Sequence, residues 1–116
     1  MVVEDDSTIR EKIYSAFVSN GFAVCGEADN GREGIEVARK IHPDLIVLDL
    51  SMPVMNGLEA APQLKSLFPA APIILFTLHA SKLLEEKASH VGVDLVMSKF
   101  EGLGNLVSNA HALMGD

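Results

Sequence analysis

Short runs of apolar residues alternate along the chain with segments in which apolar residues recur every three or four positions. The runs are Met1–Val3, Phe22–Cys25, Leu45–Leu48, Ile73–Phe76 and Leu95–Met97. Short bounded runs are typical of buried strands, and the longer spacing predicts amphipathic helices between them. Five strands alternating with five helices predict an α/β fold, in which helices cover both faces of a parallel sheet.

Two positions fit this pattern poorly. The first run leaves only three residues before Glu4, so the first strand is expected to be short. Pro62 falls inside the third helical segment, where proline removes a hydrogen bond and crowds the preceding turn. The third helix is therefore expected to start late or to bend at Pro62.

Length and charge narrow the class of protein. A chain of 116 residues is expected to form one domain, and its 16 acidic and 9 basic residues give a net charge of −7. This balance argues against direct binding to nucleic acid or to an anionic membrane.

No run approaches the ~20 apolar residues of a membrane span, and no signal peptide is visible. The single cysteine, Cys25, fits a reducing compartment and is expected to be a small buried hydrophobe. We therefore expect a cytoplasmic protein.

Polar side chains follow four of the five apolar runs. Glu4-Asp5-Asp6, Asp49, Thr77 and Ser98-Lys99 each stand directly after a run. In a parallel sheet the carboxyl ends of the strands meet at one edge, where ligands of open α/β sheets bind. Each residue alone has a plainer explanation, such as a helix cap or a solvated side chain, but their shared position favours one site.

The chemistry of this set is specific. Carboxylates around a small space suit Mg²⁺, which typically binds one or two carboxylates, several waters and phosphoryl oxygens. With Mg²⁺ bound, one carboxylate can act as a nucleophile towards phosphorus and form an aspartyl phosphate. Thr77 and Lys99 would help to position the transferred group and neutralise its charge.

The sequence resembles the receiver domain of two-component response regulators along nearly its whole length. The residues that carry the resemblance are Val2–Ser7, Leu48–Gly57, Phe76-Thr77 and Ser98-Lys99. The resemblance implies a single receiver domain over residues 1–116 with a flavodoxin-like, three-layer αβα fold. It also implies a doubly wound sheet with strand order 2-1-3-4-5.

The resemblance also implies a role for particular residues. Asp49 corresponds to the phosphorylated aspartate, Thr77 to the switch hydroxyl and Lys99 to the phosphate-binding lysine. The expected Mg²⁺ ligands are Glu4, Asp5, Asp49 and the backbone carbonyl of Ser51. Asp6 matches a variable position, so no role is carried over to it. The expected phosphodonor is a sensor histidine kinase or a phosphotransfer protein, and an output domain or partner protein would read the phosphorylated state. Such a domain is an acceptor and not a turnover enzyme.

Three residues depart from the family pattern. Phe100 stands where the family usually has proline after the lysine, and a cis bond before a non-proline residue is costly, so a trans peptide and a re-routed loop are expected. Val96 replaces the aromatic switch residue, so no ring can rotate inward on phosphorylation. Leu78 follows Thr77 where many receivers have Ala or Gly, and it narrows the expected access for a phosphodonor.

The histidines add little to this picture. His42, His90 and His111 are expected at the surface, and none has metal-ligand spacing with another His or with Cys25. His79 lies two residues beyond Thr77, on the expected rim of the site, where it could modulate the chemistry.

Three other functions remain open at this stage. The first is a receiver-like module that binds a partner without phosphorylation, which Val96 and Phe100 favour. The second is a flavodoxin-like nucleotide binder, which would need a phosphate loop in place of Glu4-Asp5-Asp6. The third is an aspartyl-phosphate phosphatase, which usually has a second Asp where this chain has Ser51 and also carries a cap domain.

Overall fold

A five-stranded parallel sheet forms the centre of the protein. The computed structural model describes residues 1–115, and its strand order is β2-β1-β3-β4-β5 with every neighbouring pair parallel. This confirms the predicted α/β fold and strand order. The strands are β1 (Val2–Val3), β2 (Glu27–Ala28), β3 (Ile46–Leu48), β4 (Ile73–Thr77) and β5 (Leu95–Ser98).

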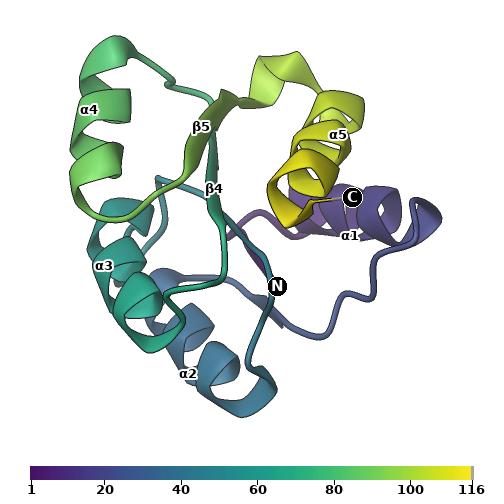
Figure 1. Cartoon of the computed structure of the whole chain (residues 1–116), viewed down its shortest axis with the longest axis horizontal. Helices are drawn as coiled ribbons and strands as arrows, with labels where there is room; N and C mark the ends of the chain where they lie inside the picture. Colours follow the sequence, from purple (N-terminus) through teal and green to yellow (C-terminus); the bar gives the residue numbers. More distant parts are fainter. Residues whose placement is uncertain (116) are drawn as a thin grey trace.

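Five α-helices cover the two faces of this sheet. They are α1 (Ser7–Ser19), α2 (Gly31–Ile41), α3 (Gly57–Leu67), α4 (Lys82–His90) and α5 (Leu103–Met114), and a short 3₁₀ helix, η1 (Lys99–Glu101), precedes α5. Helices α1 and α5 lie on one side of the sheet, whereas α2, α3 and α4 lie on the other (Figure 1). The result is a three-layer arrangement with unequal helical layers.

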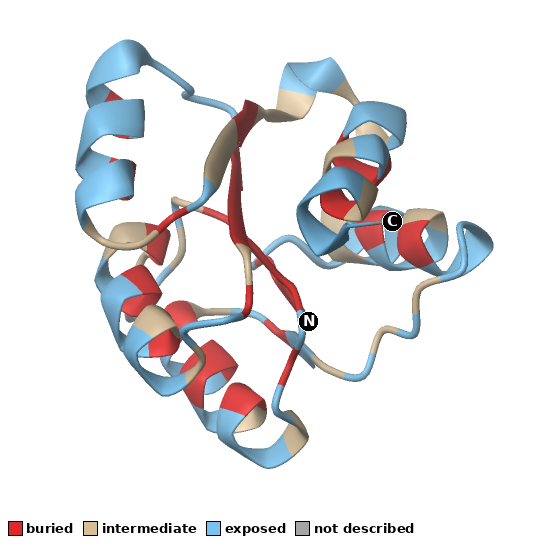
Figure 2. Cartoon of the chain, viewed as in Figure 1, coloured by how far each residue is buried: buried red, intermediate tan, exposed pale blue. Residues whose placement is uncertain are grey.

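Alternation along the central strands divides the core into two parts. In β4, Ile73 and Leu75 pack in the cluster beneath α2, α3 and α4, and Ile74 and Phe76 pack in the cluster beneath α1 and α5. Successive strand residues point to opposite faces, so a strand covered on both sides needs apolar residues throughout. The buried positions accordingly follow the strands and the inner sides of the helices (Figure 2). Within residues 1–115, none of the helices combines the length and the apolar character needed to cross a membrane.

The predicted second strand is wrong in position. The sheet pairs Val2 with Glu27 and Val3 with Ala28, so β2 begins after the apolar run Phe22–Cys25. Both residues of β1 are paired with Glu27 and Ala28, so no residue of β1 remains to pair with the run Phe22–Cys25. Cys25 is consequently exposed, and the prediction that it is a buried hydrophobe is also wrong.

Of the two outcomes expected at Pro62, a late start or a bend, the late start of the third helix is wrong. Helix α3 begins at Gly57, five residues before Pro62, and continues to Leu67. Its start is fixed by a capping box, in which the Asn56 side chain accepts from the Glu59 amide and the Glu59 carboxylate accepts from the Asn56 amide. These bonds and the burial of Leu64 hold a helix that the proline weakens.

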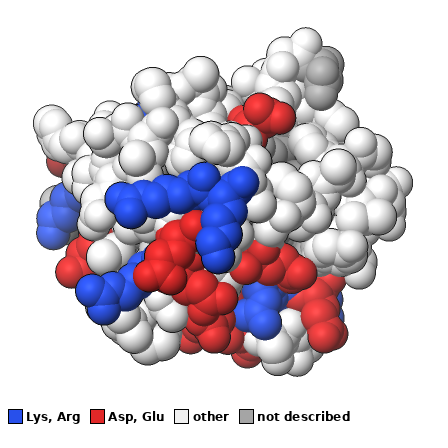
Figure 3. Space-filling view, turned by 90° about the horizontal axis from the view of Figure 1, so that it is seen from below, with Lys and Arg blue, Asp and Glu red and all other residues white. Residues whose placement is uncertain are grey.

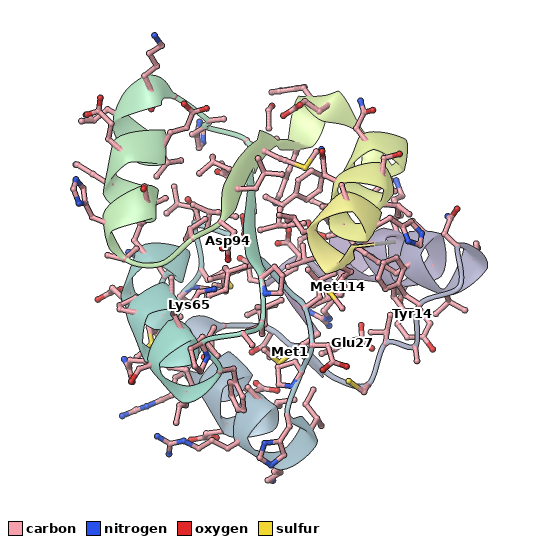
Figure 4. All side chains as sticks on the ribbon, viewed as in Figure 1. Met1, Tyr14, Glu27, Lys65, Asp94 and Met114 are labelled. Atoms are coloured by element: carbon pink, nitrogen blue, oxygen red, sulfur yellow. The ribbon has the colours of Figure 1, made fainter. Side chains whose placement is uncertain are left out.

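An ion pair fixes the turn into β5 against α3. Lys65 Nζ lies 2.8 Å from Asp94 Oδ2 and also donates to the Ala71 carbonyl at 2.9 Å. The same Asp94 oxygen accepts from the Ile73 amide at the start of β4. Lys65 and Asp94 point towards each other on the side of the sheet away from Tyr14 (Figure 4). This contact ties the amino ends of β4 and β5 to one helix.

Candidate phosphoacceptor site

Three carboxylates meet at the carboxyl edge of the sheet. Glu4 and Asp5 follow β1 directly, and Asp49 follows the adjacent strand β3. One oxygen from each side chain lies within 4.8 Å of the others. Glu4 is 2% exposed and Asp49 is 6% exposed, whereas Asp5 is exposed. The expected acidic cluster therefore forms, and two of its three members are buried.

Lys99, the first residue of η1 and the residue directly after β5, brings a positive charge to this cluster. Its Nζ atom donates to Glu4 Oε1 at 2.6 Å and lies 3.2 Å from Asp49 Oδ1. The lysine side chain is itself only 11% exposed. Strand β5 is separated from β3 by β4, so the long side chain spans the intervening strand to reach both carboxylates. Lys99 thus lies where the sequence predicted it, against the acceptor candidate.

Thr77 completes the polar set from β4. Its side chain is buried, and its hydroxyl oxygen accepts from the His79 amide at 3.2 Å. Leu78 and His79 lie on the rim as exposed residues. One crevice of about 220 Å³ contains all of these side chains. It is lined by Glu4, Asp5, Asp49, Thr77, Leu78, His79, Lys99 and exposed Ser51, together with Asp6 and Ile9. Every predicted site residue is therefore in or beside a single crevice.

The peptide bond after Lys99 is trans, as predicted from Phe100. No peptide bond in residues 1–115 is cis. The chain turns there into η1, where the Ser98 hydroxyl accepts from the Phe100 amide and the Glu101 carboxylate accepts from the Ser98 amide. The Phe100 side chain is 84% exposed. A tight helical turn after β5 thus replaces the turn that a proline would shape.

Charge and burial act against each other in the crevice. The pKa of Glu4 is raised to about 7, because burial raises it more than the hydrogen bond from Lys99 lowers it, and the neighbouring Asp49 also raises it. Burial likewise raises the pKa of Asp49 against the opposing effect of Lys99. Burial by itself lowers the pKa of Lys99, but Glu4 and Asp49 together outweigh it, so that pKa is raised. The positive charge of Lys99 therefore offsets the cost of burying the Glu4 and Asp49 carboxylates only in part.

Two residues that the sequence did not single out hold the backbone of the site. Gly57 packs directly behind the acceptor candidate, since a Cβ there would lie 2.3 Å from the Asp49 carbonyl oxygen. Arg10 donates to the Glu4 carbonyl oxygen at 2.7 Å. The Asn56-Gly57 pair indicates a turn in the sequence, but the close approach depends on how α3 packs against β3. Asp6, which had no assigned role, caps α1 by accepting from the Ile9 amide.

The loop between the acceptor candidate and α3 contains a strained residue. Val54 has a φ of 68°, and the Met55 amide donates to the Pro53 carbonyl across it at 2.7 Å. A β-branched residue in this left-handed region is an outlier. The Met55 carbonyl in turn accepts from the Gly31 amide, which ties the loop to the start of α2. The loop is thus tied to α2 at the residue that follows the strained position.

The donor set of the crevice fits a hard divalent cation. Glu4, Asp5 and Asp49 offer three carboxylate oxygens at close range, and two are buried beside a single lysine. Hard cations take oxygen ligands of this kind, and Mg²⁺ retains several waters, for which exposed Asp5 leaves access. The cluster could therefore hold a metal ion.

Comparison with known proteins identifies the family. The sequence profile of the response regulator receiver domain matches residues 1–111. The chain belongs to this family, and it is a phosphorelay receiver domain related to chemotaxis and transcription regulators.

Particular relatives support this assignment. The chain is 35% identical over 114 residues to a Pseudomonas aeruginosa protein named as a transcriptional regulator, covering 98% of this chain and 55% of that protein. It is 29% identical to the chemotaxis protein CheY of Thermotoga maritima, over 87% of this chain and 85% of CheY. A LuxR-family response regulator from Aurantimonas superposes with a TM-score of 0.90 at 30% identity, covering 99% of this chain and 83% of that one. The chain spans about half the length of the transcription regulators it matches.

Proposed function

We propose that Asp49 accepts a phosphoryl group from a phosphohistidine on a sensor histidine kinase or a phosphotransfer protein. The observation that carries this proposal is the position of the Asp49 carboxylate. It is 6% exposed at the base of an open crevice, 3.2 Å from the Lys99 ammonium and within 4.8 Å of the other two carboxylates. A carboxylate so placed can be reached by a donor and can have its product stabilised.

The transfer is a displacement at phosphorus. An oxygen of the Asp49 carboxylate forms the new O–P bond while the P–N bond to the donor imidazole breaks. The imidazole leaves with the bonding electron pair and takes up a proton. Asp49 Oδ1 is anchored by the Leu50 amide at 2.9 Å and by Lys99. We therefore assign the attack to Oδ2.

The neighbouring residues of this chain have distinct roles in the proposal. Glu4, Asp5, Asp49 and the Ser51 backbone carbonyl would hold Mg²⁺, which neutralises charge on the phosphoryl oxygens when bound. Lys99 would move its charge-assisted contact from Glu4 to a phosphoryl oxygen once the product forms. The Thr77 hydroxyl, which accepts from the His79 amide, would donate its own hydrogen to another phosphoryl oxygen.

The product would act as a switch and not as a turnover intermediate. A covalently linked output domain, or a separate partner protein, would read the phosphorylated state. The chain spans about half of several regulators in its family, which is consistent with an output domain in the whole protein. We place the function in the cytoplasm, where histidine kinases present their phosphohistidine.

Phosphorylation by a small phosphodonor tests the proposal without knowledge of the kinase. The purified protein is incubated with acetyl phosphate, with Mg²⁺ or with EDTA, and its intact mass is recorded over time. We expect a gain of one phosphoryl group that requires Mg²⁺ and is lost in Asp49→Asn. A protein that gains no phosphoryl group under these conditions would instead be a binding module that works without phosphorylation.

A further inference from the structure

Asparagine directly precedes glycine at Asn20, Asn30 and Asn56. In such a pair the side-chain amide of asparagine reacts readily with the backbone nitrogen of the next residue, because glycine has no Cβ to hinder the approach. The three pairs occupy different places in the fold, since two of them begin a helix and the third ends one. Their reactivity in the folded protein is therefore expected to differ.

The Asn56–Gly57 pair is held at both of the groups that would react. The Asn56 side-chain oxygen accepts from the Glu59 amide at 2.9 Å, which fixes the side chain at the start of α3. Gly57 is buried, and its amide nitrogen donates to the Leu50 carbonyl at 2.9 Å. The nitrogen can attack only after this bond breaks and the first turn of α3 opens, and such local opening costs free energy. The fold therefore protects Asn56.

The Asn30–Gly31 pair is held in the same way at the start of α2. The Asn30 side-chain oxygen accepts from the Glu33 amide at 2.9 Å. Gly31 is buried, and its amide nitrogen donates to the Met55 carbonyl at 2.9 Å. A Cβ at Gly31 would lie 2.7 Å from the same Met55 oxygen, so the backbone has little room to rotate towards the side chain. Asn30 is therefore protected as well.

The Asn20–Gly21 pair lies at the opposite end of a helix and is open. Asn20 is the C-cap of α1, and both residues of the pair are exposed. The Gly21 amide donates to the Val18 carbonyl at 3.3 Å, and no atom lies within 4 Å of the position that a Cβ of Gly21 would take. The Asn20 side chain donates to the Ala16 carbonyl at 2.7 Å, which is an exposed contact in the last turn of α1. Helix ends open at low cost, so the reacting groups of this pair can meet.

We propose that Asn20 is a site of covalent modification in the folded protein, at which water converts the side-chain amide to a carboxylate. The Gly21 nitrogen forms a bond to Cγ of Asn20 while the bond from Cγ to Nδ2 breaks. The side-chain nitrogen leaves as ammonia, with the proton of the Gly21 amide. Water then adds to either carbonyl of the resulting succinimide ring and opens it to aspartate or isoaspartate. The reaction is independent of phosphorylation at Asp49.

The new carboxylate would stand at the negative end of the α1 dipole, where a negative charge is unfavourable. A carboxylate also has no hydrogen to donate to the Ala16 carbonyl, so the capping contact of Asn20 is lost. Residues 13–26 contain no Lys or Arg that could offset the charge. Figure 3 shows that charged side chains gather in a band and leave an uncharged area on the side of α1 and α5. The modification should therefore loosen the end of α1.

Storage of the purified protein in mildly alkaline buffer for several days tests the proposal. Peptide mass spectrometry follows the conversion of each asparagine, and isoaspartyl methyltransferase detects the isoaspartate formed. In the folded protein we expect Asn20 to convert at least about tenfold faster than Asn30 and Asn56, because these two require local opening. In urea the three should convert at similar rates, since the fold then protects none of them.

Two substitutions test the effect of the new charge. Asn20→Asp carries the charge of the product, and Asn20→Ala loses the same donor without gaining a charge. Thermal melts should show a lower melting temperature for Asn20→Asp than for Asn20→Ala, and equal melting temperatures would overturn the inferred loosening of α1. Conversion of Asn30 or Asn56 as fast as Asn20 in the folded protein would overturn the proposed site. An Asn20 that stays intact, or a preference for Asn20 that persists in urea, would also overturn it.

Discussion

The ammonium group of Lys99 lies 2.6 Å from the carboxylate of Glu4, although 95 positions separate the two residues in sequence. The contact joins the ends of the first and last strands across the top of the sheet. It gives Lys99 a structural role in the unphosphorylated protein, because Glu4 is 2% exposed and Lys99 is the cation paired with it. Lys99 must therefore break its contact with Glu4 before it can bind a phosphoryl group on Asp49.

Lys99→Met should destabilise the unphosphorylated protein at neutral pH. It leaves the buried Glu4 and Asp49 carboxylates without their cation, which we expect to cost roughly 1–3 kcal/mol of unfolding free energy. Protonation of Glu4 limits the cost, so the effect should shrink at about pH 5. Urea unfolding at both pH values measures it. Equal stability of Lys99→Met and wild type at neutral pH would mean that the ion pair contributes nothing.

The raised pKa of Glu4 predicts how the stability of the metal-free protein depends on pH. Its pKa is about 7 in the fold and 4.5 as the reference value. Between these values the folded state binds more protons than the unfolded state, so unfolding free energy falls as pH rises through this window. Melting temperatures in EDTA should therefore decrease from about pH 5 to about pH 7.5. The Glu4→Gln variant should show a flatter profile, and a slope as steep as that of wild type would assign the titration to another group.

Asp49→Asn should melt at a higher temperature than wild type in EDTA, by roughly 2–5 °C. The substitution removes one of two buried like charges and keeps the shape of the side chain. Mg²⁺ should stabilise wild type more than this variant. With a dissociation constant of about 1 mM, about 10 mM Mg²⁺ adds ~1.4 kcal/mol by mass action. NaCl at matched ionic strength is the control. If Mg²⁺ stabilises the variant as strongly as wild type, Asp49 is not a ligand of the metal ion.

Gly57→Ala should disturb the backbone of the acceptor residue. The added methyl group would lie 2.3 Å from the Asp49 carbonyl oxygen and 2.8 Å from a methyl carbon of Leu75. We expect a loss of about 1–3 kcal/mol, measured by urea unfolding. Gly104→Ala is the matched control, because Gly104 lies in α5 with no atom within 4 Å of the added group. Gly104→Ala should leave the unfolding free energy unchanged or raise it. A smaller loss of unfolding free energy in Gly57→Ala than in Gly104→Ala would contradict the close packing at Gly57.

Val54→Asn should stabilise the protein, because asparagine tolerates a positive φ better than a β-branched residue does. Val54 is 73% exposed, so little packing is lost. We expect a gain of about 0.5–1 kcal/mol in unfolding free energy. Val54→Ala is the control, since it shortens the side chain without the tolerance of asparagine. Equal effects of the two substitutions would mean that the turn at Val54 stores no strain.

The grouping of the candidate site residues could be predicted from the sequence because each polar residue abuts an apolar run. Asp49 and Thr77 follow apolar runs that form β3 and β4, and both of these strands are buried on both faces of the sheet. The run Phe22–Cys25 has the same appearance, yet it is not a strand. The difference lies in the register of β1, which pairs with Glu27 and Ala28 and which no local pattern reveals.

The contacts within the site were beyond prediction for a related reason. The sequence places Lys99 at the same edge as Glu4, but the 2.6 Å contact depends on the strand order and on the length of a side chain that crosses β4. The close approach of Gly57 to the Asp49 carbonyl likewise depends on the packing of α3 against β3. Local patterns set where each element ends, whereas these distances are set by tertiary packing.

The central claim is that Asp49 carries the phosphoryl group, and chemical mapping tests it most directly. The protein is phosphorylated with acetyl phosphate and Mg²⁺, then reduced with borohydride, which converts an aspartyl phosphate to homoserine. Tandem mass spectrometry of the peptides locates the converted residue, with protein kept in EDTA as the control. We predict homoserine at position 49 alone, and only in the sample that contained Mg²⁺. Conversion at Asp5 or at any other carboxylate, with position 49 intact, would contradict the account.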